Sequence, residues 1–185
     1  MRASADIWTN SFDPTGEYLA NGFAIYSNLM LRTLVGFNHI AGPAGNIVVP
    51  DLAKSVPSPT NGGKTYTYRL KSGIRWAPPV NREITSKDVR YALERAARPK
   101  NGAQYGFYYP IIKGWDAYAK GEKKSISGIR TPNAKTVVIT LNEPAGDFNF
   151  RMTMPLAAPM PQEVAKCFEG KPGRYGRFVI ASGPY

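Results

Sequence analysis

The segment of residues 50–98 constrains the fold most strongly, because a strand pattern and a helix pattern follow one another there with clear boundaries. Residues 65–70 alternate, with Tyr66, Tyr68 and Leu70 on one face and polar side chains on the other. Residues two apart in a strand share a face. The alternation therefore predicts a strand that buries one side.

The second pattern predicts a helix that begins at Thr85. Thr85 and Asp88 have the spacing of a capping box, in which each side chain accepts a backbone N–H at the start of the helix. The apolar residues that follow share one helical stripe: Val89, Ala92, Leu93 and Ala96. Pro99 ends the helix, and Arg90 and Glu94 have the spacing of a surface ion pair.

Further elements are expected from periodicity and turn signals. The expected strands cover residues 5–10, 47–49, 125–130, 136–141 and 178–181. The third and fourth of these flank a turn at residues 131–134 and form a hairpin. Helices are expected over residues 19–34 and from Pro161 to Gly170, whereas the type of residues 148–154 stays open. Mixed strands and helices in this order indicate an α/β fold.

The net charge of the chain does not by itself identify a function. The 185 residues include 24 Lys and Arg against 13 Asp and Glu, a formal net charge of +11. An anionic partner, an anionic surface and an ordinary basic protein all agree with this value. The charges do not form one block, and the residues Lys120, Glu122, Lys123 and Lys124 fall in a Gly-bearing loop. We interpret most of them as solvated faces.

Residues suited to catalysis are scarce. His39 is the single histidine and is expected to be a surface or capping residue beside a Gly/Pro loop. Cys167 is the single cysteine and is expected to be a packed thiol, because no base lies near it in the sequence. No Cys/His group has metal-ligand spacing, and phosphate-loop and nucleophile-elbow motifs are absent. We expect no catalytic residue, no metal and no cofactor, and therefore a protein that is not an enzyme.

Four motifs in a fixed order carry a family resemblance. They read Pro-Asp-Leu-Ala-Lys-Ser from Pro50, Gly-Gly-Lys-Thr-Tyr-Thr-Tyr-Arg-Leu-Lys-Ser-Gly-Ile-Arg-Trp from Gly62, Ile-Thr-Ser-Lys-Asp-Val-Arg-Tyr-Ala-Leu-Glu-Arg from Ile84, and Ser-Gly-Pro-Tyr from Ser182. The chain resembles the family 5 extracellular solute-binding proteins of ABC importers, of the peptide- and nickel-binding type. It departs from them at residues 76–81, where Trp-Ala-Pro-Pro-Val-Asn replaces the usual Trp-His/Lys-Asp-Gly.

The resemblance implies a fragment of a type II periplasmic-binding-protein-like lobe, with a mixed sheet, flanking helices and an appended smaller α/β subdomain. Residues 1–38 would be the opening strand and helix of the larger lobe, residues 39–170 the smaller subdomain, and residues 171–185 the return strand. Family members are much longer, so we expect an N-terminal fragment. They are exported, often as lipoproteins, which implies a periplasmic or cell-surface location with the signal peptide absent from this chain.

The resemblance also implies a function. The protein would be the solute-binding receptor of an ABC import system, with an oligopeptide as the expected solute. Solute would bind in a cleft that is closed by a second lobe missing from this chain. The implied partners are a small-molecule or peptide solute and the ABC permease in the membrane, with no nucleic acid, and the protein is expected to be a monomer.

Candidate ligand contacts fall into two groups. Asn10, Ser11, Phe12 and Tyr18 lie in the loop that corresponds to the family segment emerging at the cleft, where backbone and small polar groups suit an extended ligand. The alternative role for this loop is a turn stabilised by Asp13.

The second group is a run of aromatic residues: Tyr105, Tyr108, Tyr109 and Trp115. Their broad apolar faces with polar edges suit peptide side chains or sugars. The alternative is that they form the core of the subdomain. Ser182 and Gly183 occupy the family's hinge-proximal motif, where a missing side chain allows close packing.

A function of another class stays open. The chain could be a basic interaction module that binds nucleic acid or an anionic envelope polymer. Such a module needs aromatic residues interleaved with Lys and Arg on one surface, and the sequence shows no such interleaving.

Overall fold

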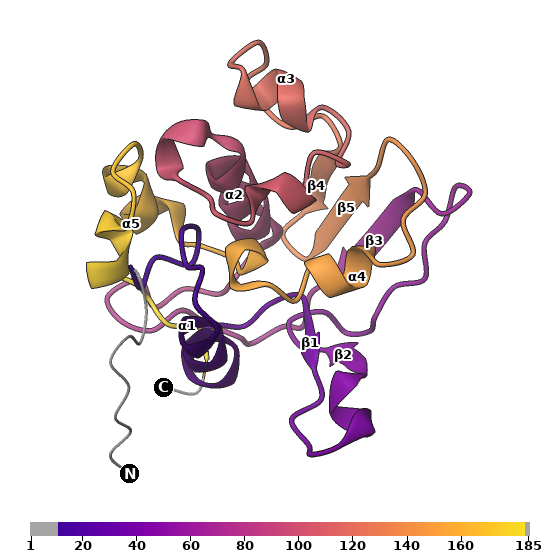
Figure 1. Cartoon of the computed structure of the whole chain (residues 1–185), viewed down its shortest axis with the longest axis horizontal. Helices are drawn as coiled ribbons and strands as arrows, with labels where there is room; N and C mark the ends of the chain where they lie inside the picture. The colour runs from indigo at the N-terminus through magenta and orange to yellow at the C-terminus, as the bar shows by residue number, and fades with distance from the viewer. Residues whose placement is uncertain (1–10, 184–185) are drawn as a thin grey trace.

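A three-stranded antiparallel sheet and one long helix form the centre of the computed structural model, which describes residues 11–183 (Figure 1). The strands are β3 (Thr65–Arg69), β5 (Thr136–Thr140) and β4 (Ile129–Asn133), in the order β3-β5-β4. Helix α2 (Ser86–Ala97) packs against β4 and β5. The strand predicted at residues 65–70, the hairpin and the helix after Thr85 are all confirmed.

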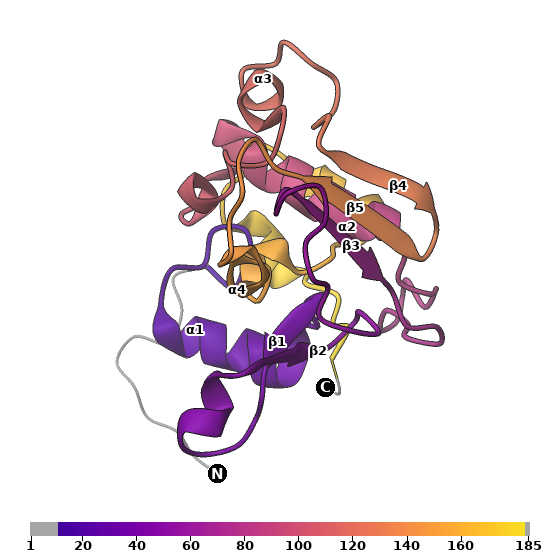
Figure 2. The same ribbon diagram turned by 90° about the vertical axis from the view of Figure 1, so that its right-hand side faces the viewer.

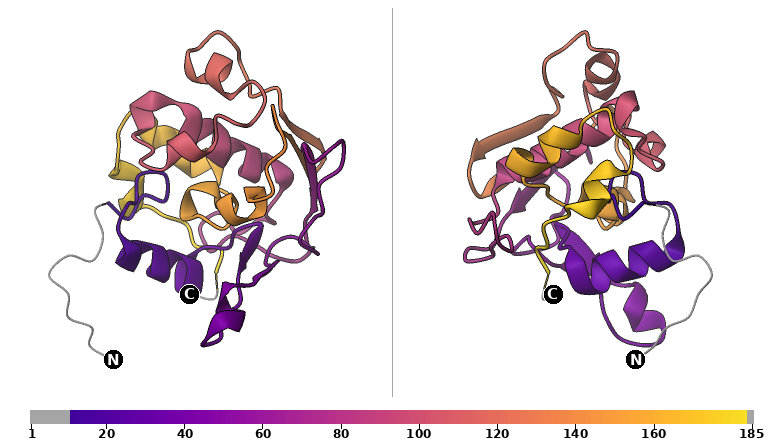
Figure 3. Two further views of the ribbon diagram at one scale, coloured as in Figure 1. Left: turned by 45° about the vertical axis from the view of Figure 1, so that its right-hand side comes forward. Right: turned by 90° about the vertical axis from the view of Figure 1, so that its left-hand side faces the viewer.

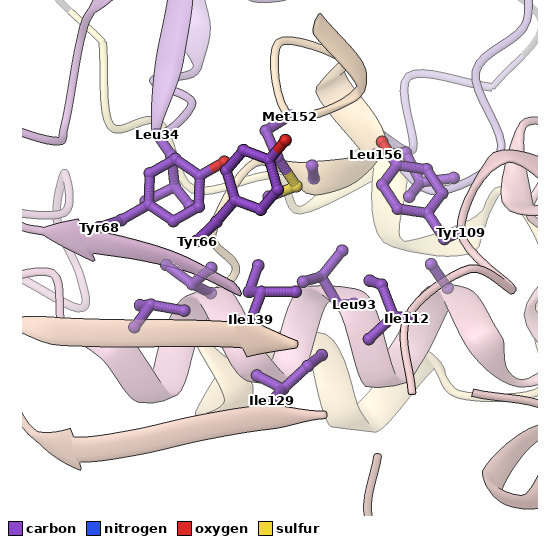
Figure 4. Close-up of a cluster of buried hydrophobic side chains, with 14 of the residues drawn as sticks. Leu34, Tyr66, Tyr68, Leu93, Tyr109, Ile112, Ile129, Ile139, Met152 and Leu156 are labelled. Atoms are coloured by element: carbon purple, nitrogen blue, oxygen red, sulfur yellow. The ribbon is translucent and has the colours of Figure 1, made fainter. Parts of the chain in front are cut away.

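The alternation of β3 explains which face of the sheet is buried. Tyr66 lies opposite Ile139 and Tyr68 opposite Val137 in the antiparallel register, and all four side chains are buried. Figure 4 shows Tyr66 and Tyr68 in one cluster with Leu93 of α2. Full burial of one aliphatic side chain stabilises a fold by about 1.5–3 kcal/mol. The other face carries Thr67 and Arg69 and is exposed, as antiparallel sheets allow.

Helix α2 begins and ends where the sequence predicted. The Thr85 N–H donates to the Asp88 carboxylate at 2.8 Å, which completes the capping box. The helix ends at Ala97, two residues before Pro99. The expected surface ion pair is present, with 2.8 Å between Arg90 Nε and Glu94 Oε1.

The other elements surround this centre. Helix α1 (Ala20–Ile25) continues into a π-helical turn (Tyr26–Met30), and β1 (Val35–Phe37) pairs antiparallel with β2 (Val48–Pro50). In Figures 1 and 2, these elements lie together on one side of α4, with the three-stranded sheet on the other. The remaining helices are α3 (Trp115–Ala119), α4 (Phe148–Arg151) and α5 (Gln162–Ala165). Short 3-10 turns cover Pro43–Asn46, Pro99–Asn101, Gly106–Tyr108, Pro155–Ala157, Lys166–Phe168 and Arg174–Arg177.

Several expected boundaries are wrong. The helix expected over residues 19–34 ends at Met30. The backbone becomes extended at Leu31 and leads into β1. The hairpin strand expected at residues 125–130 covers Ile129–Asn133, and the turn is shorter than expected. Residues 148–154 begin as the short helix α4. The strand expected at residues 5–10 lies outside the described residues.

Two further expectations fail for reasons of packing. Residues 178–181 form no strand, because within residues 11–183 they have no neighbouring strand. Their backbone bonds there include one from Ala77 N–H to the Ala181 carbonyl and one from Phe178 N–H to the Tyr175 carbonyl, which do not form a ladder. Cys167 is exposed and not packed. The preceding helix α5 buries Ala165 instead, in the cluster that contains Tyr91 and Tyr175.

A buried ion pair fastens the start of the described chain to α2. Asp13 and Arg95 have fully buried side chains, and Arg95 Nη2 lies 2.8 Å from Asp13 Oδ2. Arg95 Nη1 donates both to Asp13 Oδ1, at 2.9 Å, and to the Thr15 hydroxyl. The Tyr175 ring covers the guanidinium, with its centroid 5.5 Å from Arg95 Cζ. Segments more than 80 residues apart in the sequence therefore share one charged contact.

Arg95→Met is expected to lower the free energy of unfolding by about 3–5 kcal/mol, because it leaves the Asp13 carboxylate buried without its counter-charge. Urea unfolding followed by circular dichroism measures this loss. The same substitution at the half-exposed Arg90, one turn earlier on the helix, is the matched control and should cost about 0.5 kcal/mol. Equal losses for the two variants would contradict this role of the pair.

Arg82 joins the start of α2 to α5 through two carboxylates. Its guanidinium lies 2.6 Å from Asp88 Oδ1 and 2.7 Å from Glu163 Oε1. The hydrogen bonds from Arg82 lower the pKa of Glu163 below its ordinary value of 4.5. A lowered pKa means that this carboxylate binds a proton more weakly in the folded than in the unfolded chain.

Acid is expected to remove the stabilisation that Glu163 provides. That stabilisation is complete above pH 4.5 and is lost as the pH falls through the lower, folded-state pKa. The difference in melting temperature between the wild type and Glu163→Gln should therefore shrink between neutral pH and about pH 3. A difference that stays constant over this range would contradict the pairing.

Candidate functional site

A groove lined by aromatic side chains opens between α1, β1 and α4. Its volume is about 480 Å³, within the range of small-ligand sites. The walls carry Phe23 from α1, Phe37 from β1, Tyr108 from the loop after α2, and Phe150 and Met154 from α4 and the turn that follows. We call this feature the aromatic groove. Phe150 is 50% exposed and Phe37 is 42% exposed, so its apolar walls face solvent.

Stacked rings extend the groove toward the start of the chain. Tyr18 lies nearly parallel to Tyr105, with ring centroids 5.2 Å apart, and Phe23 contacts the same ring at 5.3 Å. Tyr108 stacks at 6.1 Å from Tyr105. The Tyr105 hydroxyl donates to the Tyr18 carbonyl at 3.3 Å. Ring pairs at these separations attract one another beyond their buried area, and they hold the loop after α2 against the segment before α1.

Arg151 supplies the polar end of the groove and holds its walls together. Arg151 Nε donates to Asp147 at 2.9 Å, and Arg151 Nη1 donates to the Tyr108 carbonyl at 2.7 Å. The buried Tyr109 hydroxyl in turn donates to the Arg151 carbonyl at 2.6 Å. These bonds tie α4 to the aromatic loop in both directions.

The hydroxyls of Tyr105 and Tyr109 remain protonated at neutral pH. Burial raises the pKa of Tyr105 above its ordinary value of 10, and its neighbours Tyr18 and Tyr108 raise it further. Burial also raises the pKa of Tyr109. Both hydroxyls therefore act as hydrogen-bond donors, to the Tyr18 and Arg151 carbonyls.

The residues predicted to contact ligand separate into three sets. Tyr18, Tyr105 and Tyr108 come together beside the aromatic groove. Tyr109 and Trp115 are buried in the core, where their rings stack 5.7 Å apart. Tyr109 and Trp115 therefore lie where the alternative expectation, a role in the core, would place them.

The opening loop lies differently from the aromatic run. The Ser11 hydroxyl accepts the Asp13 N–H at 3.1 Å, and Phe12 packs edge-on against Tyr26 with centroids 6.0 Å apart. Both contacts belong to the turn around Asp13, and neither residue lines the groove. Asn10 lies outside the described residues.

Of the residues that line the groove, sequence reasoning named only Tyr108 as a candidate contact. Among those it missed, Phe23 belonged to an expected helix, Phe37 to an expected loop, and Phe150 and Arg151 to the segment whose type stayed open. The alternation of Phe148 with Phe150 would place both rings on one face of a strand, but the segment begins as the helix α4 and separates them. In the structure Phe148 is buried and Phe150 is exposed.

The hinge-proximal motif packs closely, as predicted. The N–H groups of Ser182 and Gly183 both donate to the Met30 carbonyl, at 2.9 and 2.8 Å, and the Ser182 hydroxyl accepts the Arg32 N–H at 2.9 Å. A Cβ atom at Gly183 would come within 2.5 Å of the Leu29 carbonyl oxygen. Only glycine fits this approach.

Over residues 11–183, no three His, Cys, Asp or Glu side chains gather as metal ligands. His39 is exposed and lines a hollow of about 400 Å³ next to the aromatic groove. In the same part of the chain, every helix is too short or too polar to cross a bilayer.

Comparison with known proteins gives one consistent family. Residues 48–185 match the model of the bacterial extracellular solute-binding proteins, family 5 middle region. A dipeptide-binding protein of Lactococcus lactis subsp. cremoris is 29% identical over 136 residues, which cover 72% of this chain and 24% of that protein. The oligopeptide-binding protein AliA of Streptococcus pneumoniae is 36% identical over 124 residues, which cover 64% of this chain and 18% of AliA.

Solved structures agree on the fold. The clavulanic acid biosynthesis oligopeptide binding protein 2 matches with a TM-score of 0.83 and 31% identity, over 96% of this chain and 31% of that protein. The chain thus spans about a fifth to a third of the length of the relatives it matches. Its mixed α/β architecture corresponds to part of the oligopeptide-binding protein fold. The chain belongs to the family 5 bacterial extracellular solute-binding proteins.

Proposed function

We propose that this chain is part of an extracytoplasmic receptor that binds oligopeptides for an ABC importer. The relatives named above are dipeptide- and oligopeptide-binding proteins, which supports a peptide as the solute. In this proposal residues 1–38 and 171–185 belong to the larger lobe of a type II periplasmic-binding-protein-like receptor, and residues 39–170 form its smaller subdomain. The ABC permease is the membrane partner.

One observation carries the proposal, namely that the aromatic groove has apolar walls and stands open to solvent. Phe37 and Phe150 in its walls are each more than two-fifths exposed, and so is Phe107, which packs against Tyr108 beside the groove. A contiguous exposed apolar patch of this kind usually marks a binding surface. Closure of a second lobe over the groove would remove this surface from water and would enclose a solute at the same time.

The groove suits peptide side chains more than a fixed sequence. Tyr18, Tyr105 and Tyr108 present aromatic surface that suits apolar or aromatic side chains. We propose these three as direct contacts. Asn10, Ser11 and Phe12 are proposed to support the same end of the cleft through backbone groups, whereas Tyr109 and Trp115 hold the groove from the core.

Peptide affinity is expected to need the second lobe. Isothermal titration with di- to hexapeptides should detect binding by a longer protein that contains this chain and supplies the second lobe. This chain alone should bind at least about 100-fold more weakly, because most of the ligand surface then stays in water. In thermal unfolding, peptide at a hundredfold excess over its Kd adds about 2.7 kcal/mol to the binding form. Tight peptide binding by this chain alone would contradict a cleft between two lobes.

Removal of Tyr108 from the groove wall, or of Tyr105 from the stack beside it, is expected to weaken peptide binding in that longer protein. Tyr105→Ala and Tyr108→Ala should each raise Kd by about 5- to 30-fold, which corresponds to the 1–2 kcal/mol of a well-packed aromatic contact. Phe178→Ala is the matched control, because Phe178 is an exposed aromatic residue that stacks on Phe168 and belongs neither to the groove nor to the tyrosine stack. An unchanged Kd in both tyrosine variants would exclude the groove as the peptide site.

A further inference from the structure

A group of exposed cations lies on turns that do not line the aromatic groove. Six exposed cationic residues lie on the turns after α2, α3 and α5: Lys100, Lys123, Lys124, Lys171, Arg174 and Arg177. We call them the basic face. The right-hand view of Figure 3 looks at this side, with residues 162–177 in yellow and α3 above them.

Contacts between the turns make these residues one surface. Lys100 lines a hollow together with Lys123 and Lys124. On its other side, a Cβ atom at Gly170 would lie 3.5 Å from Lys100 Cδ, and Gly170 N–H donates to Asn101 Oδ1 at 2.7 Å. Lys171 follows directly, and Arg174 and Arg177 share the next 3-10 turn. The basic face therefore continues from the loop after α3 to the turn after α5.

Acidic neighbours compensate little of this charge. Glu169 forms a short ion pair with Arg98 and a longer one, of 3.9 Å, with Lys100 Nζ. Glu122 is exposed in the loop beside Lys123. Within residues 11–183, the other five cations of the basic face form no ion pair with a carboxylate. Their combined field remains available to an anionic partner.

An apolar pair stands in the middle of the cations. The rings of Phe168 and Phe178 stack 4.9 Å apart with 18° between their planes. Together with Lys171, Arg174 and Arg177 they line a hollow of about 520 Å³, and Phe178 is 53% exposed. Exposed rings flanked by Lys and Arg suit the boundary between lipid headgroups and acyl chains.

We infer that the basic face docks on an anionic phospholipid surface, with its Lys and Arg on the phosphates and Phe178 at the headgroup boundary. Single-stranded nucleic acid is typically held by separate rings that each stack a base, whereas Phe168 and Phe178 stack on one another and present a single apolar patch among the cations. The choice of lipid rests on the proposed function in one respect, since an import receptor meets its permease at a membrane. The binding itself follows from charge and exposed apolar surface alone.

Vesicle sedimentation of the 185-residue chain tests the inference. The chain should bind vesicles of 30% phosphatidylglycerol in phosphatidylcholine and should not bind pure phosphatidylcholine. Because exposed charges are screened by salt, the bound fraction should fall several-fold as the salt rises from about 0.05 M to about 0.3 M. Absence of binding to the anionic vesicles, or equal binding to both compositions, would overturn the inference.

A charge-matched pair of triple variants separates the basic face from overall charge. Lys171→Gln, Arg174→Gln and Arg177→Gln together should lower the partition coefficient about 100-fold, since each cation near the surface contributes about a fivefold factor. The control replaces Lys54, Arg69 and Arg130 by Gln. These residues are exposed at the three-stranded sheet, away from the basic face. Equal losses in the two triple variants would overturn the inference.

Two further measurements test the role of Phe178 and separate lipid binding from nucleic-acid binding. Phe178→Ser, with its fold checked by circular dichroism, should weaken binding to anionic vesicles and leave its salt dependence unchanged. A DNA duplex is the competing anion: if the basic-face variant loses duplex binding while the wild type ignores the vesicles, the face is a nucleic-acid site and the lipid assignment is wrong. Peptide titration is independent of all these assays, so failure of the lipid inference and failure of the proposed function are read separately.

Discussion

The buried ion pair between Asp13 and Arg95 is the contact on which the site depends. Two opposite charges without exposure to water cost several kcal/mol each in desolvation, and only close geometry with further hydrogen bonds offsets that cost. The pair meets this condition through its two short contacts and the Thr15 hydroxyl. Because Arg95 belongs to the best-defined helix of the chain, the pair fixes the segment that leads to Tyr18 and α1. One wall of the aromatic groove is thereby set against the other.

The aromatic groove is assembled from segments that are far apart in sequence. Its walls come from α1, from β1, from the loop after α2 and from α4. Arg151 bonds α4 to the loop after α2 through the Tyr108 carbonyl. The groove therefore exists only when these segments pack against one another.

The aromatic groove and the basic face are two separate regions of the surface with different chemistry. Aromatic and other apolar side chains line most of the groove, whereas exposed Lys and Arg gather around the turns after α2, α3 and α5. The groove and the basic face share no residue. An anionic surface on the basic face, as inferred above, would therefore not occupy the residues that line the groove.

Local chemistry in the sequence was sufficient for the elements whose signals lie within a few residues. The Thr85 and Asp88 capping box, the stop at Pro99, the alternation of residues 65–70 and the hairpin of β4 and β5 were all predictable, because capping and alternation act between near neighbours. The family motifs were likewise readable from the sequence. Tertiary structure alone decided that Tyr108 lines the groove while its neighbour Tyr109 is buried. It also decided that Arg95 meets Asp13, that Cys167 is exposed, and that residues 178–181 form no strand in the described chain. Burial and pairing depend on partners that are distant in the sequence, and only packing brings those partners together.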